Sequence, residues 1–202
     1  MNGKYRYGLL AGASVLLAVS ATATAQSQKW DFQVFLDDQP IGYHHFALRD
    51  LRDAGSEREL KSEARFDVKL LFITAYRYAH DATEHWRGNC LAQINARTDD
   101  NGAKSEVGAE PKDGCVMSFA YWNPEMLQQT RLLNAQTGKL ETISITPQGE
   151  EKISVRGTPT LAKRYRITGP KHPIDLWYGA DRSWLALQST QESGRRLRYQ
   201  LK

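Results

Sequence analysis

The stretch Phe72–Trp86 reads FITAYRYAHDATEHW and changes character at every second residue. One side of an extended chain would carry Phe72, Thr74, Tyr76, Tyr78, His80, Ala82, Glu84 and Trp86. Successive side chains of a β-strand point to opposite faces, so this alternation predicts a long strand. The face it creates combines aromatic rings with a histidine and a carboxylate.

Shorter runs with the same period lie on both sides of this strand. They are Trp30–Val34, Ile41–Arg49, Leu60–Val68, Leu91–Arg97, Val116–Trp122, Leu140–Thr146, Lys152–Arg156, Leu161–Ile167, Ile174–Tyr178, Trp184–Gln188 and Arg195–Leu201. Turn-forming residues separate them; the run Asp99-Asp100-Asn101-Gly102 is typical of a hairpin turn. The sequence therefore predicts a mainly β protein with roughly eleven or twelve antiparallel strands and no parallel α/β pattern.

A twisted sheet of that many strands does not stay flat and open. We expect a strongly curved antiparallel sheet, forming a barrel or half-barrel, with a two-layer sandwich as the alternative. One short helix is predicted over Asn123–Leu133, because Asn123 suits the N-cap and Pro124 the first helical position. Met126, Leu127, Thr130 and Leu133 would then form one stripe that packs on the sheet.

The first 25 residues have the layout of a cleaved secretory signal. Lys4 and Arg6 precede an apolar run from Gly8 to Val19, and Ala23-Thr24-Ala25 matches a small-x-small cleavage site. The apolar run is shorter than the about 20 residues that a membrane-spanning helix needs. We expect residues 1–25 to be removed, leaving a single soluble β-rich domain over 26–202 in the periplasm, with no membrane span.

Charge argues against nucleic acid as a partner. The full chain has 27 basic and 23 acidic side chains, and removing Lys4 and Arg6 leaves a net charge of +2. Charges of both signs are interspersed along the chain, so no field for steering phosphate is expected.

Cys90 and Cys115 are the two cysteines of the chain. Each follows a turn-like pair of residues, and an exported protein enters an oxidising compartment. We therefore expect one disulfide between them. A metal site or a reactive thiol is the alternative, but the pair lacks a CxxC spacing.

Catalytic and metal-binding patterns do not emerge from the sequence. On a strand, His80 and Glu84 would lie about 13 Å apart and could not share a proton. His44 and His45 would face opposite sides of a strand and could not bind one metal ion. The sequence contains no nucleophile elbow, phosphate loop or dinucleotide fingerprint. We predict no cofactor, no metal and no enzymatic activity, although a hydrolase or isomerase using His80 or Glu84 with partners from other strands stays open.

The face of Phe72–Trp86 has two interpretations. It is either the wall of a ligand cavity, lined by Tyr76, Tyr78, His80, Glu84 and Trp86, or an ordinary core face that reaches solvent at one end. The first leads to our main hypothesis, a non-enzymatic periplasmic binding protein for an apolar or amphiphilic ligand such as a lipid or acyl chain. The second leads to a structural or protein-interaction component of the cell envelope that has no small-molecule ligand.

Several motifs resemble a family of exported bacterial proteins known only as a domain of unknown function. They are Phe72…Tyr76-x-Tyr78-x-His80…Glu84-x-Trp86, Thr98–Gly102, Leu132-Leu133-Asn134…Gly138-Lys139-Leu140 and Asp175-Leu176-Trp177-Tyr178. The resemblance covers most of the chain after residue 25, and it implies a periplasmic β-rich fold without assigned catalytic residues. The expected architecture is also similar, more loosely, to periplasmic lipoprotein carriers and lipocalin-like barrels.

Overall fold

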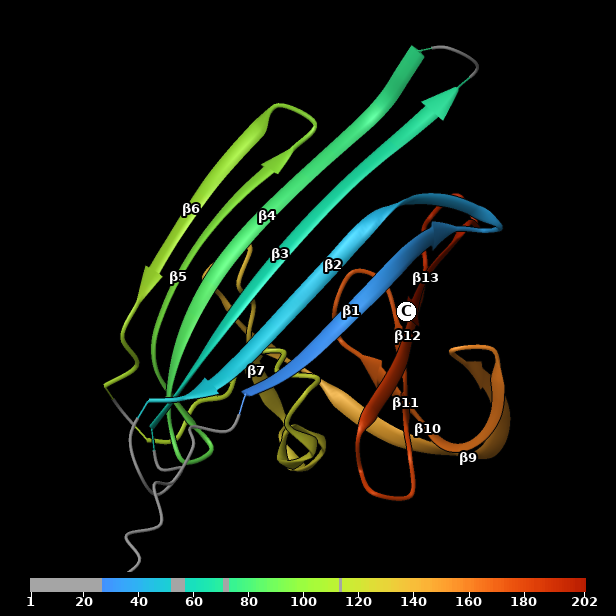
Figure 1. Ribbon diagram of the computed structural model, residues 1–202. Coiled ribbons are helices and arrows are strands. Elements are labelled where there is room, and N and C mark those ends of the chain that lie inside the picture. Colours follow the sequence, from blue (N-terminus) through green and yellow to red (C-terminus); the bar gives the residue numbers. More distant parts are fainter. Residues whose placement is uncertain (1–26, 52–56, 71–72, 113) are drawn as a thin grey trace, which may run out of the picture.

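The regular secondary structure in the described part of the chain is almost entirely β (Figure 1). The computed structural model describes residues 27–51, 57–70, 73–112 and 114–202. Eleven strands form one antiparallel sheet: β1 (Ser27–Leu36), β2 (Gln39–Asp50), β3 (Glu57–Leu70), β4 (Ile73–Arg87), β5 (Cys90–Asp100), β6 (Ala103–Ala109), β9 (Ser144–Val155), β10 (Thr158–Thr168), β11 (Ile174–Tyr178), β12 (Trp184–Thr190) and β13 (Arg196–Leu201). Two short strands, β7 (Arg131–Leu133) and β8 (Leu140–Thr142), pair separately.

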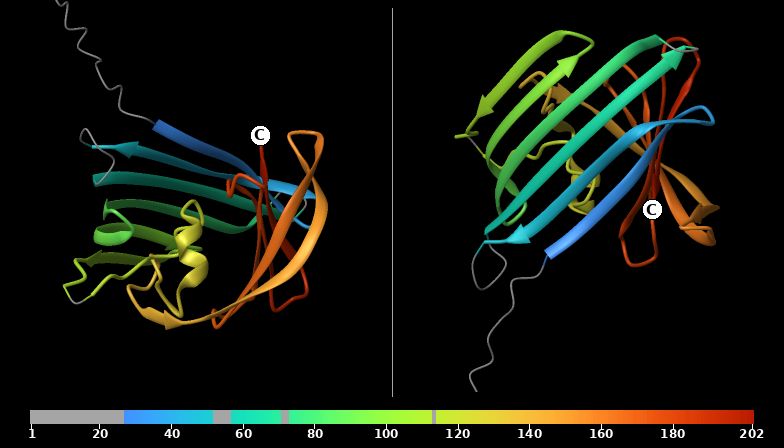
Figure 2. Two further views of the ribbon diagram at one scale, coloured as in Figure 1. Left: turned by 90° about the horizontal axis from the view of Figure 1, so that it is seen from below. Right: turned by 45° about the horizontal axis from the view of Figure 1, so that its top comes forward.

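The order of the large sheet is β6-β5-β4-β3-β2-β1-β13-β12-β11-β10-β9. Strand β1 pairs with β2 on one side and with β13 on the other, with Phe32 opposite Leu201 and Leu36 opposite Leu197. The β1–β6 half and the β9–β13 half cross at a steep angle and wrap around a common interior (Figure 2). The predicted curved antiparallel sheet is confirmed. Within the described residues the edge strands β6 and β9 do not pair, so the sheet is not closed.

The segment between β6 and β9, called here the inner segment (residues 110–143 apart from 113), lies between the two halves of the sheet (Figure 2, left, yellow). Its apolar side chains belong to the larger core cluster, the first cluster, together with residues from both halves. They are Met117, Ala120, Trp122, Met126, Leu132, Leu133 and Ile143. The inner segment therefore fills part of the space that the curved sheet encloses.

The helix predicted over Asn123–Leu133 is much shorter than expected. Only Pro124–Gln128 is helical, as a single 3-10 turn, and the Asn123 side chain caps it by accepting from the Glu125 N–H at 3.1 Å. Leu132 and Leu133 instead belong to strand β7, where the Leu133 N–H donates to the Met117 carbonyl. So short a helix is marginal alone, and here the buried strand pairing decides the conformation.

One predicted strand is wrong, and one observed strand was not predicted. Val116–Trp122 forms no strand and contributes one isolated bridge, Ser118 to Leu133, because this stretch turns within the interior. Strand β6 was not predicted; its residues are mostly exposed and lack apolar alternation. The hairpin between β5 and β6 turns at Asn101 and Gly102, both with positive φ, as the Asp99–Gly102 motif predicts.

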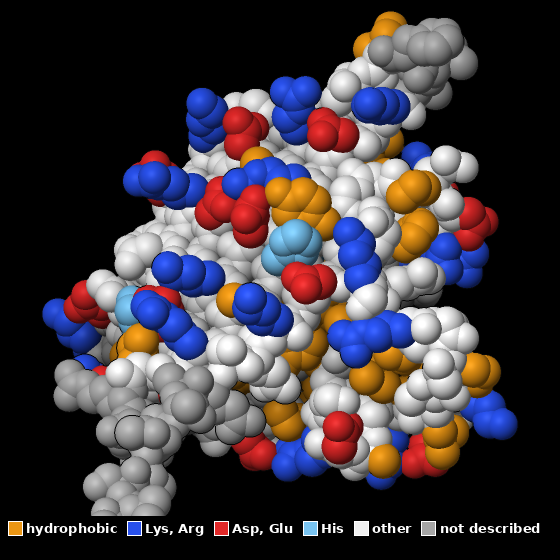
Figure 3. Space-filling model, viewed as in Figure 1, with side chains coloured by type: hydrophobic (Ala, Val, Ile, Leu, Met, Phe, Trp, Pro, Cys, Tyr) orange, Lys and Arg blue, Asp and Glu red, His pale blue; other side chains and the backbone are white. Residues whose placement is uncertain are grey.

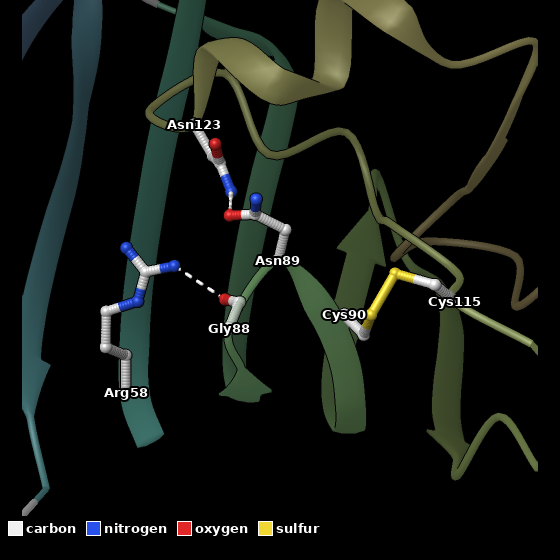
Figure 4. Close-up of a disulfide and its surroundings, with 6 residues drawn as sticks. All are labelled: Arg58, Gly88, Asn89, Cys90, Cys115 and Asn123. Atoms are coloured by element: carbon white, nitrogen blue, oxygen red, sulfur yellow. Dashed lines mark hydrogen bonds between the residues drawn. A yellow bond between two sulfur atoms is a disulfide. The ribbon is translucent and has the colours of Figure 1, made fainter. Parts of the chain in front are cut away.

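A disulfide between Cys90 and Cys115 joins β5 to the inner segment, as predicted (Figure 4). The Leu91 N–H donates to the Val116 carbonyl beside it, at 2.8 Å. The Asn123 amide also donates to Asn89 Oδ1 at 3.1 Å. The bond indicates an oxidising, extracytoplasmic compartment. The predicted signal sequence, residues 1–25, lies outside the described residues.

Candidate functional site

The five residues proposed from the sequence all lie on β4 and share the inner face of the sheet. The structure does not bring them to one point, because β4 is long and its two ends meet different neighbours. Glu84 and Trp86 lie at the end covered by the inner segment, whereas Tyr76 lies near the other end and is only half-buried.

Trp86 and Glu84 are tightly enclosed. Trp86 is 1% exposed, and its ring meets the Trp122 ring edge to face at 5.3 Å between centroids. The Trp86 indole N–H donates to Glu84 Oε2 at 3.0 Å. Burial raises the pKa of Glu84 to about 7, and the neighbouring Ser118 hydroxyl and the Trp86 indole oppose that shift. This end of the face is therefore packed core that contains one buried acid.

The tyrosines lie farther along the same strand. The Tyr78 ring stacks on Phe66 of β3 at 5.1 Å between centroids and is buried. The Tyr76 hydroxyl donates to Asp100 Oδ1 at 2.7 Å, near the turn between β5 and β6. Burial is the main cause that raises the pKa of both hydroxyls above the usual value, so they are neutral hydrogen-bonding groups.

His80 belongs to a row of four residues, three of them polar, that crosses the inner face. In the strand register His44 lies opposite Ala64, Ala64 opposite His80, and His80 opposite Thr98. We call these four residues the histidine band. His80 Nδ1 lies 2.8 Å from the Thr98 hydroxyl, and His44 Nδ1 lies 3.3 Å from the hydroxyl of Tyr199 on β13. Burial lowers the pKa of both histidines, that of His44 strongly.

The histidine band separates two apolar regions. On one side lies the first cluster, which the inner segment fills. On the other side lies a second cluster, which shares Ala64 with the band. Its other buried members are Val34, Ile41, Phe66 and Tyr78, and its half-buried members are Leu36, Val68, Tyr76, Leu197 and Tyr199. All its members come from strands of the large sheet, and none comes from the inner segment. The second cluster is therefore apolar inner surface that stays partly open to solvent at its rim.

His44 carries an unpaired polar atom at this boundary. Its Nε2 is inaccessible to solvent and has no hydrogen-bond partner in the described part of the chain. The imidazole itself stacks on Phe46 at 4.0 Å between centroids. A buried polar group without a partner costs about 1–3 kcal/mol, so His44 Nε2 lowers the stability of the folded protein.

The outer face of the β1–β6 half is charged (Figure 3). It holds a shallow groove of about 800 Å³, lined by residues such as His45, Lys61 and Glu63 and by none of the five proposed residues. Charges near it are paired; Arg65, for example, contacts both carboxylate oxygens of Asp81 at 2.8 and 2.9 Å. This arrangement is typical of a solvated sheet face.

Metal binding and membrane crossing by helices find no support in the described residues. Across residues 27–51, 57–70, 73–112 and 114–202, no three histidine, cysteine or acidic side chains are placed to hold a metal ion. No helix in these ranges has the length and apolar character needed to cross a bilayer.

A comparison with known families identifies the family of this chain. The model of a domain of unknown function, DUF6134, matches residues 32–202. The chain belongs to the DUF6134 family. The match includes β1 from Phe32 onward and every other strand of the large sheet, and the family description assigns no activity.

A solved structure supports the fold of this DUF6134 protein. The beta-barrel-like protein of the domain of unknown function DUF1849 from Brucella abortus superimposes with a TM-score of 0.51 and 8% sequence identity, covering 88% of this chain and 95% of the other. At that identity the likeness concerns the fold alone. A comparison with curated proteins found no match.

Sequence reasoning found one half of the histidine band and missed the other in this DUF6134 protein. His80 was proposed, whereas His44 was considered only as a metal ligand and Tyr199 not at all. The alternation already placed His44 and His45 on opposite faces, so one of them had to point inward. Only the strand register shows that His44 is the inward-facing one. The register also brings His44 to Tyr199, which lies 155 residues later in the chain.

Proposed function

We propose that this protein is a periplasmic, non-enzymatic binding protein for an apolar or amphiphilic, lipid-like ligand. Its site would be the second cluster together with the histidine band. Tyr76, Tyr78 and His80 would line this site, while Glu84 and Trp86 would support it from beneath the inner segment. In this respect it would work like a lipocalin or a lipoprotein carrier, to which it is compared by fold.

One observation carries this proposal: a partly open apolar surface borders a row of buried polar groups on the inner face of a curved sheet. Half-buried Val68, Leu197 and Tyr76 offer apolar contact at the rim. Sites for small ligands combine such apolar walls with a few oriented polar groups. An amphiphile has the matching division into an apolar chain and a polar end.

The test is native mass spectrometry of protein purified from the periplasm, followed by solvent extraction and titration with an alkyl alcohol. We expect a co-purified amphiphile or saturable binding of the added alcohol. A chain that carries no amphiphile and binds none contradicts the proposal. If crosslinked cells then yield a protein partner instead, the structural envelope role takes its place.

The variant Val68→Gln tests where the ligand binds. Val68 lies on β3 within the second cluster, so a polar amide there should weaken binding about tenfold, which corresponds to about 1.4 kcal/mol of lost apolar contact. The matched control is Lys69→Gln, which puts the same side chain at the exposed neighbour and should leave affinity unchanged. Equal affinity of both variants would place the site elsewhere.

A further inference from the structure

The edge strand β6 leaves one side of its backbone unpaired. All seven of its residues pair with β5, and in the described part of the chain no strand lies on the other side. Figure 1 shows this free side at the margin of the sheet. The inner segment touches β6 from the inner face, where the Ser105 hydroxyl donates to the Gln136 carbonyl at 3.2 Å. The free side of β6 is therefore open to another strand.

The turn between β5 and β6 determines which backbone groups point to the free side. It has two residues, Asn101 and Gly102, both with positive φ, so the flanking residues Asp100 and Ala103 exchange backbone hydrogen bonds. In an antiparallel ladder such pairs alternate with pairs that do not exchange hydrogen bonds. Every second residue of β6 therefore turns its N–H and C=O groups away from β5. These residues are Lys104, Glu106 and Gly108.

The sequence of β6 is self-complementary when a second copy pairs with it in antiparallel orientation about Ser105. Lys104 then lies opposite Glu106 of the second copy, and Glu106 lies opposite its Lys104. Each of these pairs exchanges two backbone hydrogen bonds and brings opposite charges together. The small Ser105 lies opposite itself on the two-fold axis. Lys104 forms no ion pair within the described residues, and Glu106 contacts the exposed Arg97 at 3.3 Å.

Other registers are less favourable for two copies of β6. Centring the pair on Lys104 or on Glu106 would set that charge against its own copy, and like charges directly opposite destabilise a sheet. Centring it between two residues would set outward backbone groups against inward ones and lose the hydrogen bonds. Centring it on Val107 would pair Lys104 with Glu110 of the second copy, which lies beyond the end of β6 and accepts from Gln93 at 3.0 Å.

The other edge strand of the large sheet, β9, is less suited to pairing with its own copy. Glu150 and Lys152 could pair there about Glu151, but this register sets Glu151 against Glu151 of the second copy. Pro147 in the same strand has no N–H to donate to a ladder. Strand β6 contains no proline, and in the register about Ser105 its charges meet opposite charges.

We infer that β6 is an interface at which two copies of this chain join their sheets edge to edge, with the two-fold axis at Ser105. This interaction goes beyond the proposed ligand binding and does not depend on it. The same surface of both copies meets in a two-fold dimer, so self-complementarity is the property that such an interface needs. One strand of seven residues makes a small interface. We therefore expect a weak dimer that forms as concentration rises, and monomers in dilute solution.

Cysteine crosslinking tests the position of the two-fold axis. Ser105→Cys places a thiol beside its own copy, in a pair whose Cα atoms are about 4.5 Å apart, where a disulfide can form. The native cysteines are already bonded to each other. The matched control is Ser154→Cys, which puts the same exposed thiol on β9. We expect a disulfide-linked dimer of Ser105→Cys on a non-reducing gel after mild oxidation, and little from the control. No linked dimer, or equal amounts from both variants, overturns the inference.

Sedimentation of the protein purified from the periplasm, at increasing concentration, tests the register. Lys104→Glu and Glu106→Lys each set like charges opposite one another in both symmetric pairs, so each should raise the dissociation constant of the dimer at least tenfold. The double variant exchanges the two charges and should return the dissociation constant to within about threefold of the unmodified value. Lys152→Glu makes the same charge change on β9 and should leave it unchanged.

Three results of the sedimentation experiment would overturn the inference. The first is an unmodified protein that stays monomeric at about 1 mM. The second is a double variant that dimerises as weakly as the single variants. The third is a Lys152→Glu protein that loses as much affinity as Lys104→Glu.

Discussion

Glu84 makes the stability of this protein depend on pH. Its pKa is about 7 in the folded protein and 4.5 without the fold, because burial penalises the carboxylate. The folded state thus holds the proton more tightly than the unfolded state between these two values. Stability from this group is fully present below pH 4.5 and is lost as pH rises through 7, by about 3 kcal/mol in all.

Glu84→Gln should therefore flatten the dependence of stability on pH. Its amide oxygen can still accept from the Trp86 indole, and it cannot ionise. Urea unfolding should show the variant more stable than the unmodified protein by about 1–3 kcal/mol at pH 8. At pH 5 the difference should largely vanish. The control Glu106→Gln, on the exposed edge strand, should keep the original pH profile; a Glu84→Gln protein that also keeps it would show that Glu84 is not the titrating group.

Position 42 requires glycine because the backbone of β2 comes very close to that of β3 there. Its φ is +151°, and a Cβ there would collide with the carbonyl of Arg65 on the neighbouring strand. Gly42→Ala should therefore lower the free energy of unfolding by about 1–3 kcal/mol. Gly149→Ala is the matched control, because its φ is also positive but a Cβ there meets open space. Thermal unfolding of both variants tests this prediction. If Gly149→Ala lost as much stability as Gly42→Ala, the positive φ alone, and not the collision with Arg65, would be responsible.

Among the elements, the disulfide has the clearest energetic role. It joins β5 to the inner segment across a sequence separation of 25 residues. In the chain-entropy model, closing a loop of this length stabilises the fold by about 3 kcal/mol. The double variant Cys90→Ser, Cys115→Ser should lose about that much in urea unfolding, and the reduced unmodified protein should match it. An unchanged unfolding midpoint would show that the remaining contacts of the inner segment suffice.

The sequence predicted those elements whose own residues carry the signal. The alternation of side chains predicted β4. The motif Asp99–Gly102 predicted the hairpin after β5, because the positive φ of Asn101 and Gly102 is a preference of those residues themselves. The inner segment was harder. Val116–Trp122 alternates like a strand, yet it turns inside the protein, where contacts with distant residues such as Trp86 fix its path. Local pattern cannot distinguish these two uses of apolar residues.

At the scale of the whole molecule, the candidate site depends on pairings across the full chain. The two ends of the β4 face differ: Trp86 is packed core, and Tyr76 is half-buried near the other end. The sequence could not predict which end of the β4 face is packed, because the inner segment covers only one end. Nor could it show that His44 faces the same interior as His80.

The pairing of β1 with β13 has a consequence for folding. The two strands meet along five residue pairs, Phe32–Leu201 to Leu36–Leu197, although they are separated by most of the described sequence. One side of β1 stays unpaired until Arg196–Leu201 is available to pair with it. Contacts between segments so far apart form slowly. Assembly of the continuous sheet therefore depends on its last strand, and a chain without Arg196–Leu201 would leave an unprotected edge in the middle of the molecule.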